Sequence, residues 1–311
     1  MPHGILHLDK PVGLSSNSAL QRVRRLFGRN AKAGYAGTLD PMATGVLPIF
    51  IGEATKFISY TSESVKSYEA LVQLGWTSTT GDREGELAKA ADIHVDDENM
   101  VAVVKHFSGT LLQVPPMYSA IKVSGKPLYS YARSGVDIER APRTIVIYEL
   151  KLEIISDQMM KMWVTCSKGT YVRVLAQDIA KYFGTGGYLT ELRRTRVGDI
   201  AETETLKLDH LDSLSPIELP RVLRPLDSCL GGLAKIKVCN EFKNRLINGL
   251  AVNVEGGSQV NCKVWPAHVR LYDGADFFLG VGELYKTGEL RAKRLLSTTF
   301  YGGRASDNSL Y

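Results

Sequence analysis

The sequence predicts an α+β fold: a mixed, mainly antiparallel sheet with flanking helices, followed by a small C-terminal β-barrel. In residues 1–230, alternating apolar runs follow one another through turns, with helical patterns between them, and no regular βαβ series appears. A proline-rich stretch at 214–229 ends this part and is interpreted as a linker. Beyond it, short alternating strands are broken by glycine-containing turns. We therefore expect two domains, 1–230 and 231–311, in this chain of 311 residues.

The first elements are a strand at 4–8, a Pro-Gly turn at 10–13 and a helix. Ser16 or Asn17 can cap the helix, and Gly28 is placed to end it. Its apolar positions recur at helical spacing: Leu20, Val23, Leu26 and Phe27.

The middle of the chain supplies the rest of the predicted sheet. Residues 68–74 alternate as a strand with one buried face, and 96–107 have helical spacing behind an acidic cap. Two Val- and Ile-rich runs between 144 and 167 are split by Ser-Asp-Gln at 156–158, which predicts a hairpin. A helix then leads to Gly184.

The charge is unevenly placed, although the net charge of +5 is modest. Residues 1–60 hold seven basic and three acidic side chains, and residues 231–311 hold 11 and seven. The middle holds 20 basic and 23 acidic side chains. Two basic ends suit a polyanion bound across both parts, since phosphate neutralisation drives nucleic-acid affinity. Ordinary solvated surfaces explain the charge equally well.

Several classes of protein are disfavoured by what the sequence lacks. No apolar stretch approaches the roughly 18 residues of a membrane span, and no signal-peptide pattern opens the chain, so we expect a cytoplasmic protein. The four cysteines have no CxxC pairing and the histidines are scattered, so no metal is expected. GxSxG, P-loop and dinucleotide fingerprints are absent.

The remaining candidate for chemistry is Asp40, within the dense run at residues 32–48. An aspartate directly before proline is a good helix N-cap, and cap statistics alone favour that role. Catalytic side chains also sit on short loops that a scaffold holds rigid, so catalysis stays open.

The run at 32–48 resembles the N-terminal signature of the TruB family of tRNA pseudouridine synthases. Further motifs of that family follow in matching order over the first two thirds of the chain, at 4–16, 52–56, 66–68, 115–122, 126–133, 167–173 and 192–198. The C-terminal segments at 277–284 and 291–296 are similar to the PUA-like RNA-binding domain of bacterial members. So many motifs in register make a chance match improbable.

The resemblance implies isomerisation of a T-loop uridine of tRNA, at position 55 in tRNA numbering, to pseudouridine. The base flips out, its N-glycosidic bond breaks, and a C–C bond forms to the same ribose. No redox change or group donor is needed, so no cofactor is expected. The implied partner is the T-arm of tRNA, with no membrane and no obligate protein partner.

The resemblance also assigns roles to single residues. Asp40 is the catalytic aspartate, able to attack the sugar, add to the base or remove a ribose proton, and Arg173 pairs with it. Tyr68 stacks on the extruded base. Tyr171 and Leu192 line the uridine pocket. Without the resemblance, Arg173 would be interpreted as a surface arginine at a helix start. The other three residues would be interpreted as ordinary core packing.

An insertion at 109–139 resembles the family's T-arm grip, in which Lys122, Lys126 and Arg133 would meet phosphates. Solvated loop charges are the alternative. Asp82 also lies in a loop that the family has, and a turn role is the better interpretation for it.

One residue departs from the family pattern. Tyr35 stands where the family commonly has histidine, and tyrosine is longer and stays neutral near pH 7. We predict that Tyr35 keeps a pocket contact but has no acid-base role. It is also the one hint of a rival function, a non-catalytic tRNA-binding protein that helps RNA fold.

Overall fold

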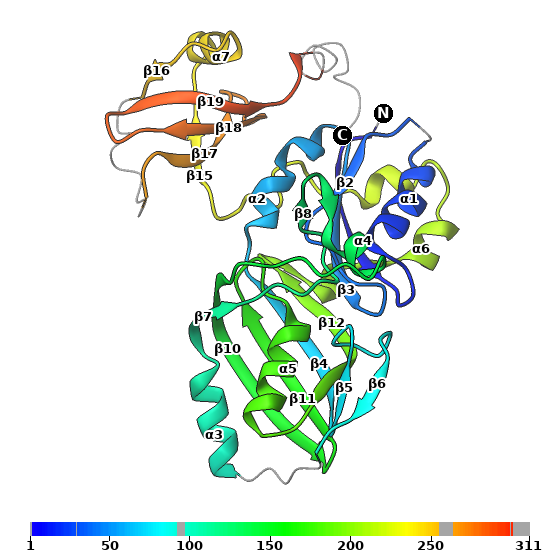
Figure 1. Ribbon diagram of the computed structural model, residues 1–311. Coiled ribbons are helices and arrows are strands. Elements are labelled where there is room, and N and C mark those ends of the chain that lie inside the picture. The colour runs from blue at the N-terminus through cyan, green and yellow to red at the C-terminus, as the bar shows by residue number, and fades with distance from the viewer. Residues whose placement is uncertain (1, 29, 92–96, 255–263, 299, 301–311) are drawn as a thin grey trace.

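A computed structural model of the chain describes residues 2–28, 30–91, 97–254, 264–298 and 300. It contains one large mixed sheet flanked by helices and one small sheet formed by the C-terminal residues (Figure 1). The predicted α+β class is confirmed.

The large sheet has ten strands in the order β14-β1-β3-β12-β4-β11-β10-β7, with β13 beside β12 and β2 beside β3. Neighbouring strands are antiparallel except at β1·β14 and β3·β12, so the sheet is mainly antiparallel, as predicted. The strands are β1 (Gly4–Lys10), β2 (Ala33–Tyr35), β3 (Thr44–Ile51), β4 (Lys66–Leu74), β7 (Gly109–Gln113), β10 (Arg143–Ser156), β11 (Met159–Cys166), β12 (Gly187–Val197), β13 (Ile200–Ala201) and β14 (Leu206–Lys207).

The short parallel junction of β3 and β12 joins the two halves of this sheet. It consists of the pairs Arg193↔Thr44 and Arg194↔Gly45, whereas β12 pairs with β4 along its whole length. The chain segment that enters β3, residues 36–43, therefore lies where β3, β12 and β4 meet.

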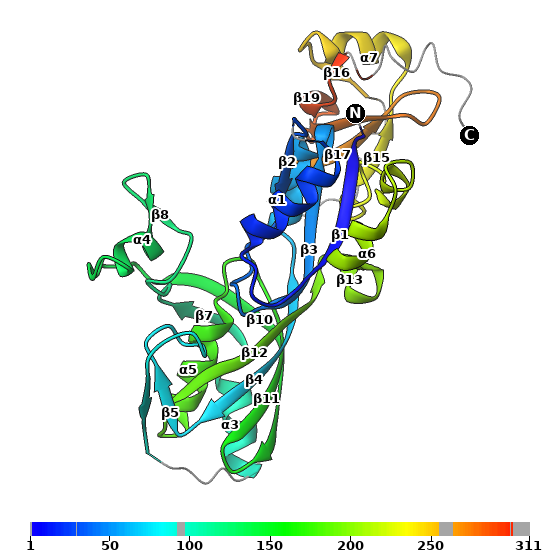
Figure 2. The same cartoon turned by 90° about the vertical axis from the view of Figure 1, so that its right-hand side faces the viewer.

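Helices flank the large sheet, with α5 packed on β12, whereas α7 lies on the C-terminal sheet and α4 stands away from both sheets (Figures 1 and 2). They are α1 (Ser16–Leu26), η1 (Gly52–Phe57), α2 (Ile58–Ser62), α3 (Asp97–His106), α4 (Leu128–Ala132), α5 (Val172–Tyr182), η2 (Glu202–Glu204), α6 (Leu208–Ser213), η3 (Leu219–Val222) and α7 (Asn240–Ile247). The predicted helices before Gly28 and Gly184 are confirmed. Of the predicted helix at 96–107, residue 96 lies outside the described residues.

The cap of α1 differs from the prediction. Ser15 is the N-cap, because its hydroxyl accepts a hydrogen bond from the backbone N–H of Ser18 at 3.0 Å. The expected caps, Ser16 or Asn17, both lie inside the helix, and the buried Ser16 hydroxyl bonds to Leu39 instead.

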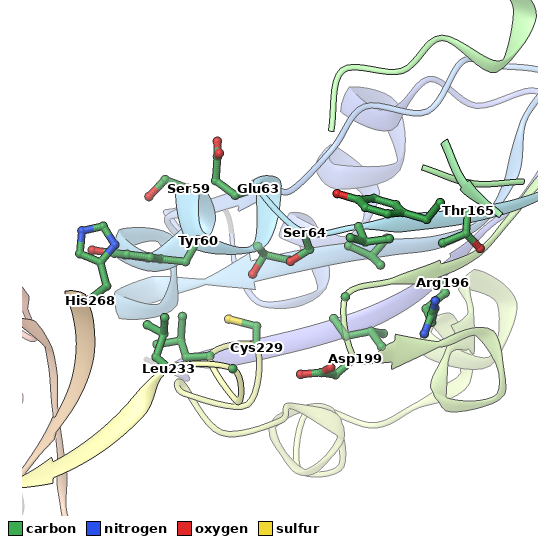
Figure 3. A pocket seen from close by; sticks show the side chains of 18 of the residues that line it. Ser59, Tyr60, Glu63, Ser64, Thr165, Arg196, Asp199, Cys229, Leu233 and His268 are labelled. Atoms are coloured by element: carbon green, nitrogen blue, oxygen red, sulfur yellow. The ribbon is translucent and has the colours of Figure 1, made fainter. Parts of the chain in front are cut away.

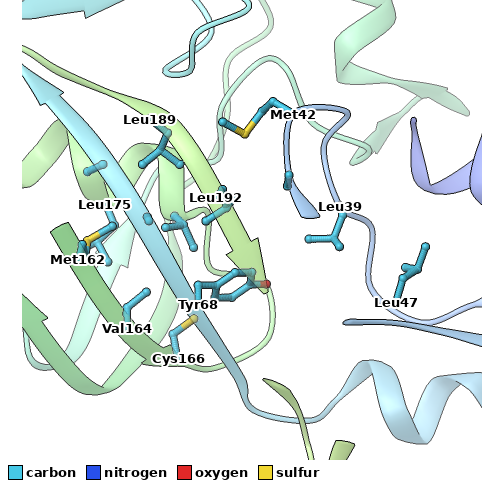
Figure 4. Close-up of a cluster of buried hydrophobic side chains, with 14 of the residues drawn as sticks. Leu39, Met42, Leu47, Tyr68, Met162, Val164, Cys166, Leu175, Leu189 and Leu192 are labelled. Atoms are coloured by element: carbon cyan, nitrogen blue, oxygen red, sulfur yellow. The ribbon is translucent and has the colours of Figure 1, made fainter. Parts of the chain in front are cut away.

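The main hydrophobic core lies between α5 and the sheet (Figure 4). Leu175 and Ile179 of α5 are buried against apolar side chains of β4 and β11. The predicted hairpin is confirmed, since β10 and β11 pair antiparallel around the turn at 157–158. Burial of this kind contributes about 25 cal/mol per Å² of apolar surface.

The C-terminal sheet has five strands in the order β15-β17-β18-β19-β16, with a core of its own. The strands are β15 (Ala234–Lys237), β16 (Val252–Asn253), β17 (Ala267–Tyr272), β18 (Phe278–Leu284) and β19 (Glu289–Leu295). Phe57 and Phe278 pack edge to face between the two sheets, with ring centroids 5.3 Å apart. A small C-terminal β domain was predicted and is found; residues 255–263, 299 and 301–311 of it lie outside the description.

Two small hairpins complete the chain: β5 (Trp76–Ser78) with β6 (Leu87–Lys89), and β8 (Lys122–Val123) with β9 (Lys126–Pro127). The segment with β8 and α4 stands away from the body of the sheet (Figure 2). The proline-rich stretch is not a loose linker, because Arg224 exchanges two backbone hydrogen bonds with Ile5 of β1.

Candidate active site

Asp40 lies on the segment that leads into β3, and no helix follows it. Pro41 and Met42 form a turn closed by a hydrogen bond from the Ala43 N–H to the Asp40 carbonyl, at 3.1 Å. The N-cap interpretation of Asp40, which local statistics favoured, is therefore wrong. The turn lies between Gly37, which has a φ of 74°, and the parallel strand junction that begins at Thr44.

Two buried side chains hold the backbone on either side of Asp40. The Ser16 hydroxyl accepts from the Leu39 N–H at 2.7 Å and donates to the Leu39 carbonyl at 2.9 Å. The Lys10 ammonium donates to the carbonyls of Leu14 at 2.6 Å and Pro41 at 3.4 Å. The carboxylate therefore projects from a fixed backbone.

Arg173 forms an ion pair with Asp40, with Nε 3.0 Å from Oδ2. The Arg173 side chain is only 4% exposed, whereas that of Asp40 is 35% exposed. Arg173 also donates to the carbonyls of Thr80 and Tyr118, each at 2.7 Å. It is a buried residue at the start of α5, so the alternative of a surface arginine is wrong.

Asp82 is a second carboxylate beside Arg173, 3.5 Å away, and is itself buried. It accepts hydrogen bonds from the Thr80 hydroxyl at 2.6 Å and the Glu84 N–H at 3.0 Å, which is the expected turn role. Its contact with Arg173 was not predicted, because a turn aspartate gives no sequence signal for a charged partner far along the chain.

The charges of this cluster act on the pKa of Asp40 in opposite directions. Burial raises that pKa above the ordinary value for aspartate, and the negative charge of Asp82 adds to the rise. The guanidinium of Arg173 opposes it through its charge and its hydrogen bond. Arg173 thus keeps the carboxylate ionisable in a site that would otherwise favour its protonated form.

A pocket of about 330 Å³ opens on one side of Asp40. Tyr68 from β4, Tyr171 before α5 and Leu192 from β12 line it, together with Lys66 and Arg194. Figure 4 shows the Tyr68 ring extending from β4 beside Leu192, with its hydroxyl toward the side where Leu39 lies. Burial raises the pKa of both tyrosines, so both stay neutral near pH 7.

A second pocket, of about 620 Å³, opens on the other side of the Asp40–Arg173 pair. Tyr35, Lys122 and Arg133 line it, with Asp82 and Glu84. Lys126 lines neither pocket; its ammonium lies 4.9 Å from the ring centroid of Tyr131. The structure thus gathers eight of the nine predicted site residues around one ion pair.

Comparison with known proteins identifies the family. The family model described as TruB family pseudouridylate synthase, N-terminal domain, matches residues 24–172. Models of the tRNA pseudouridylate synthase B C-terminal domain and of the pseudouridine synthase II TruB C-terminal region match 173–231 and 244–296. A curated "tRNA pseudouridine synthase B" of Nitrosospira multiformis is 46% identical over 300 residues, which are 94% of this chain and 95% of that protein. The chain belongs to the TruB family.

Other similar proteins agree. The TruB relative in Aromatoleum aromaticum is 44% identical over 295 residues, covering 95% of this chain and 93% of its own. A chain in a crystal structure of a Cbf5-Nop10-Gar1 complex superposes with a TM-score of 0.69 at 22% identity, over 94% of this chain and 85% of that one. That likeness supports the fold.

A larger cleft, of about 1050 Å³, lies between α2 and the C-terminal sheet of this TruB protein (Figure 3). Tyr60 and His268 meet there with ring centroids 5.2 Å apart. None of the site residues predicted from the sequence is among the described residues that line it. Size alone would therefore have pointed away from the Asp40–Arg173 pair.

Neither a metal cluster nor a membrane span is found within the described ranges. No group of three or more histidine, cysteine, aspartate or glutamate side chains there could hold a metal ion. No helix in the same part of the chain is long and apolar enough to cross a membrane.

Sequence reasoning missed Lys10, Ser16, Lys66 and Arg194 as residues of the site. Their short motifs were recognised, but the contacts with the Asp40 segment depend on strand pairing between distant parts of the chain. A signal was available for the two lysines and the arginine, since charged residues within apolar strand patterns are rarely buried without partners.

Proposed function

We propose that this TruB protein isomerises uridine to pseudouridine in tRNA, and that its target is the T-loop uridine at position 55. The observation that carries the proposal is the Asp40–Arg173 ion pair at the junction of two pockets, one of which holds the Tyr68 ring. The names of the curated relatives supply the substrate class.

The reaction needs little beyond a positioned carboxylate. The bond between N1 of uracil and C1′ of ribose breaks, the base turns, and a bond forms between C5 and the same C1′. The proton of C5 is lost and N1 gains one, so substrate and product are isomers. No electron or group has to be supplied from outside.

Asp40 is proposed as the group that reacts, as an ionised carboxylate. It can attack C1′, add to the base or remove a ribose proton, and each route needs an ionised oxygen within reach of the nucleoside. Arg173 favours the charged form and fixes one oxygen by its 3.0 Å contact. Asp82 in turn holds Arg173 in place.

The smaller pocket is proposed to hold the extruded uracil. A base removed from its helix loses stacking energy, which a flat ring such as Tyr68 returns. Tyr171 is fixed for a similar role, because Gln113 bonds to its N–H at 2.8 Å and its carbonyl at 3.1 Å. Leu192 closes the pocket with an apolar wall.

The larger pocket is proposed to take the RNA next to the target. Lys122 and Arg133 line it from the projecting segment within 109–139, and Lys126 lies on the same exposed hairpin. Tyr35 offers a ring there without an acid-base role. These residues suit phosphates and bases of the T-arm.

We assign residues 1–230 to catalysis and residues 231–311 to RNA binding. We further propose that the protein acts on tRNA in the cytoplasm.

The function is tested by incubating the protein with an unmodified tRNA transcript and mapping pseudouridine at single-nucleotide resolution. A matched transcript carries cytidine at position 55. We expect one product, at position 55, in the first transcript and none in the second. Pseudouridine elsewhere would refute the proposed target, and tRNA binding without any product would support the rival role in RNA folding.

A further inference from the structure

Arg194 is the largest side chain that is completely buried in the described structure, with an exposure of 0%. It lies on β12 at the parallel junction with β3. Burying an arginine is costly unless all of its donors find acceptors. An apolar residue of similar volume would fill the same space without that cost. The cation therefore needs an explanation beyond packing.

The guanidinium of Arg194 reaches three elements of the site. Its Nε donates to the Val46 carbonyl of β3 at 2.8 Å, and one terminal nitrogen donates to the Gly37 carbonyl at 2.9 Å. Arg194 is also the register partner of Tyr68 on β4, and both side chains line the smaller pocket. Within the described part of the chain its guanidinium thus bonds to two backbone carbonyls beside the Tyr68 ring, and not to a carboxylate.

Both ends of the segment that carries Asp40, Gly37 and Gly45, lie in close contact with Arg194. A Cβ atom on Gly37 would lie 3.1 Å from a terminal nitrogen of its guanidinium. A Cβ atom on Gly45 would lie 2.2 Å from the backbone carbonyl oxygen of Arg194. Both glycines have a positive φ, of 74° and 99°, which side-chain-bearing residues rarely adopt. Residues 37–45 are therefore attached to Arg194 at both ends, with Asp40 between them.

We propose that Arg194 is a positioning residue that ties the Tyr68 ring to the segment carrying Asp40, so that the base and the carboxylate keep one relative placement. The proposal rests on the proposed function. Arg194 touches neither the reacting atoms nor Asp40; it acts through Gly37 and Tyr68. A misplacement of about 1 Å in such a site can cost on the order of 100-fold in rate.

Arg194→Lys is the main test variant. It keeps the positive charge, but a lysine lacks the planar fork of donors that bonds to Val46 and Gly37 while lying beside Tyr68. In single-turnover reactions with enzyme in excess, we expect the rate of pseudouridine formation to fall about 10- to 100-fold. The dissociation constant for tRNA should change by less than about twofold, because the residue is buried and meets no phosphate.

The neighbouring Arg193→Lys variant is the matched control. Arg193 lies on the same strand and in the same parallel junction, but its side chain pairs with Asp9 and Glu202 away from the pockets. We expect its single-turnover rate to stay within about twofold of wild type. A fall in rate in both variants would mean that any change in this stretch of β12 harms the site, and would overturn the specific role of Arg194.

A double-mutant cycle with Tyr68→Phe tests the proposed link itself. Tyr68→Phe removes only the hydroxyl, so Arg194→Lys should cost at least about fivefold less in that background than in wild type. Strictly multiplicative effects, or an unchanged rate in folded Arg194→Lys protein, would overturn the proposal. So would an Arg194→Lys variant that does not fold, since the arginine would then serve the stability of the sheet. A wild-type protein without product would instead refute the proposed function.

Discussion

Arg173 and Asp40 are in contact at 3.0 Å, yet the arginine is almost completely buried and the aspartate keeps a third of its side-chain surface exposed. The arginine is therefore the fixed member of the pair, anchored by two carbonyls and by Asp82. The carboxylate is the member that can meet a substrate.

Replacing the anchor should harm catalysis more than binding. Arg173→Met leaves Asp40 and Asp82 without their shared cation, and we expect the single-turnover rate to fall about 100- to 1000-fold. Removing one partner of a buried pair should also cost about 3–5 kcal/mol of unfolding free energy. Urea denaturation and single-turnover kinetics measure the two effects separately. A folded variant with wild-type rate would show that the pair is not used in the reaction.

The pH dependence of the rate should follow the ionisation of Asp40. The carboxylate acts when deprotonated, so the single-turnover rate should fall as the pH drops through its pKa. Because burial raises that pKa, the fall should begin at a higher pH than for an ordinary aspartate. Arg173 opposes the rise, so the residual activity of Arg173→Met should fall at a still higher pH. A shift to lower pH in that variant would contradict the electrostatic account.

Tyr35 is expected to serve as a ring and not as an acid or base. Tyr35→Phe should keep its single-turnover rate within about threefold of wild type, because the ring that lines the larger pocket remains. Complete inactivity of this variant would refute that view. Tyr35→Ala, which removes the ring, should weaken RNA binding by the energy of one base-stacking interaction, about 1–3 kcal/mol.

The projecting hairpin should contribute charge to tRNA binding. The triple variant Lys122→Ala, Lys126→Ala, Arg133→Ala should weaken binding and flatten the plot of log affinity against log salt by about 0.7–0.9 for each phosphate that these side chains neutralise in the wild-type complex. Lys105→Ala is the control, since Lys105 is exposed on α3 and lines neither pocket at Asp40. An unchanged salt slope in the triple variant would show that these side chains are merely solvated.

Gly45 should be intolerant of any side chain. Gly45→Ala should lower the unfolding free energy by more than the roughly 1–2 kcal/mol expected from a positive φ alone, because its Cβ meets the Arg194 carbonyl. Gly28→Ala isolates the backbone effect: Gly28 has a φ of 106° and nothing within 4 Å of its Cβ position. Equal decreases in unfolding free energy, measured by urea denaturation, would argue against the close approach.

The fold was predictable where local patterns decide it. The α1 and α5 periodicities, the β10–β11 hairpin and the separate C-terminal strands follow from spacing and turn residues. The parallel junction of β3 and β12 was not predictable in this way, because it joins two distant parts of the chain through only two register pairs. Gly45 and Arg194 meet there, and no local signal links them.

In the candidate site, too, local patterns predicted some features, and contacts between distant parts of the chain decided the others. The residues next to Asp40 predict a helix N-cap. Only the family motifs in matching order along the chain predicted a catalytic role for it. Tertiary contacts override that preference: Ser16, which looked like a cap, bonds to Leu39, and Lys10 bonds to Pro41. Tyr35, the one departure from the family pattern, lines the larger pocket, and its contact with substrate stays a prediction.

The central claim is that the Asp40 carboxylate carries out the reaction, and Asp40→Asn tests it most directly. The amide has the same shape but cannot act as a nucleophile or base, so tRNA should bind with an affinity within a few-fold of wild type while pseudouridine at position 55 is not formed. Single-turnover incubation of excess Asp40→Asn protein with unmodified tRNA, followed by mapping of position 55, gives the answer. Product formed at the wild-type rate would contradict the account.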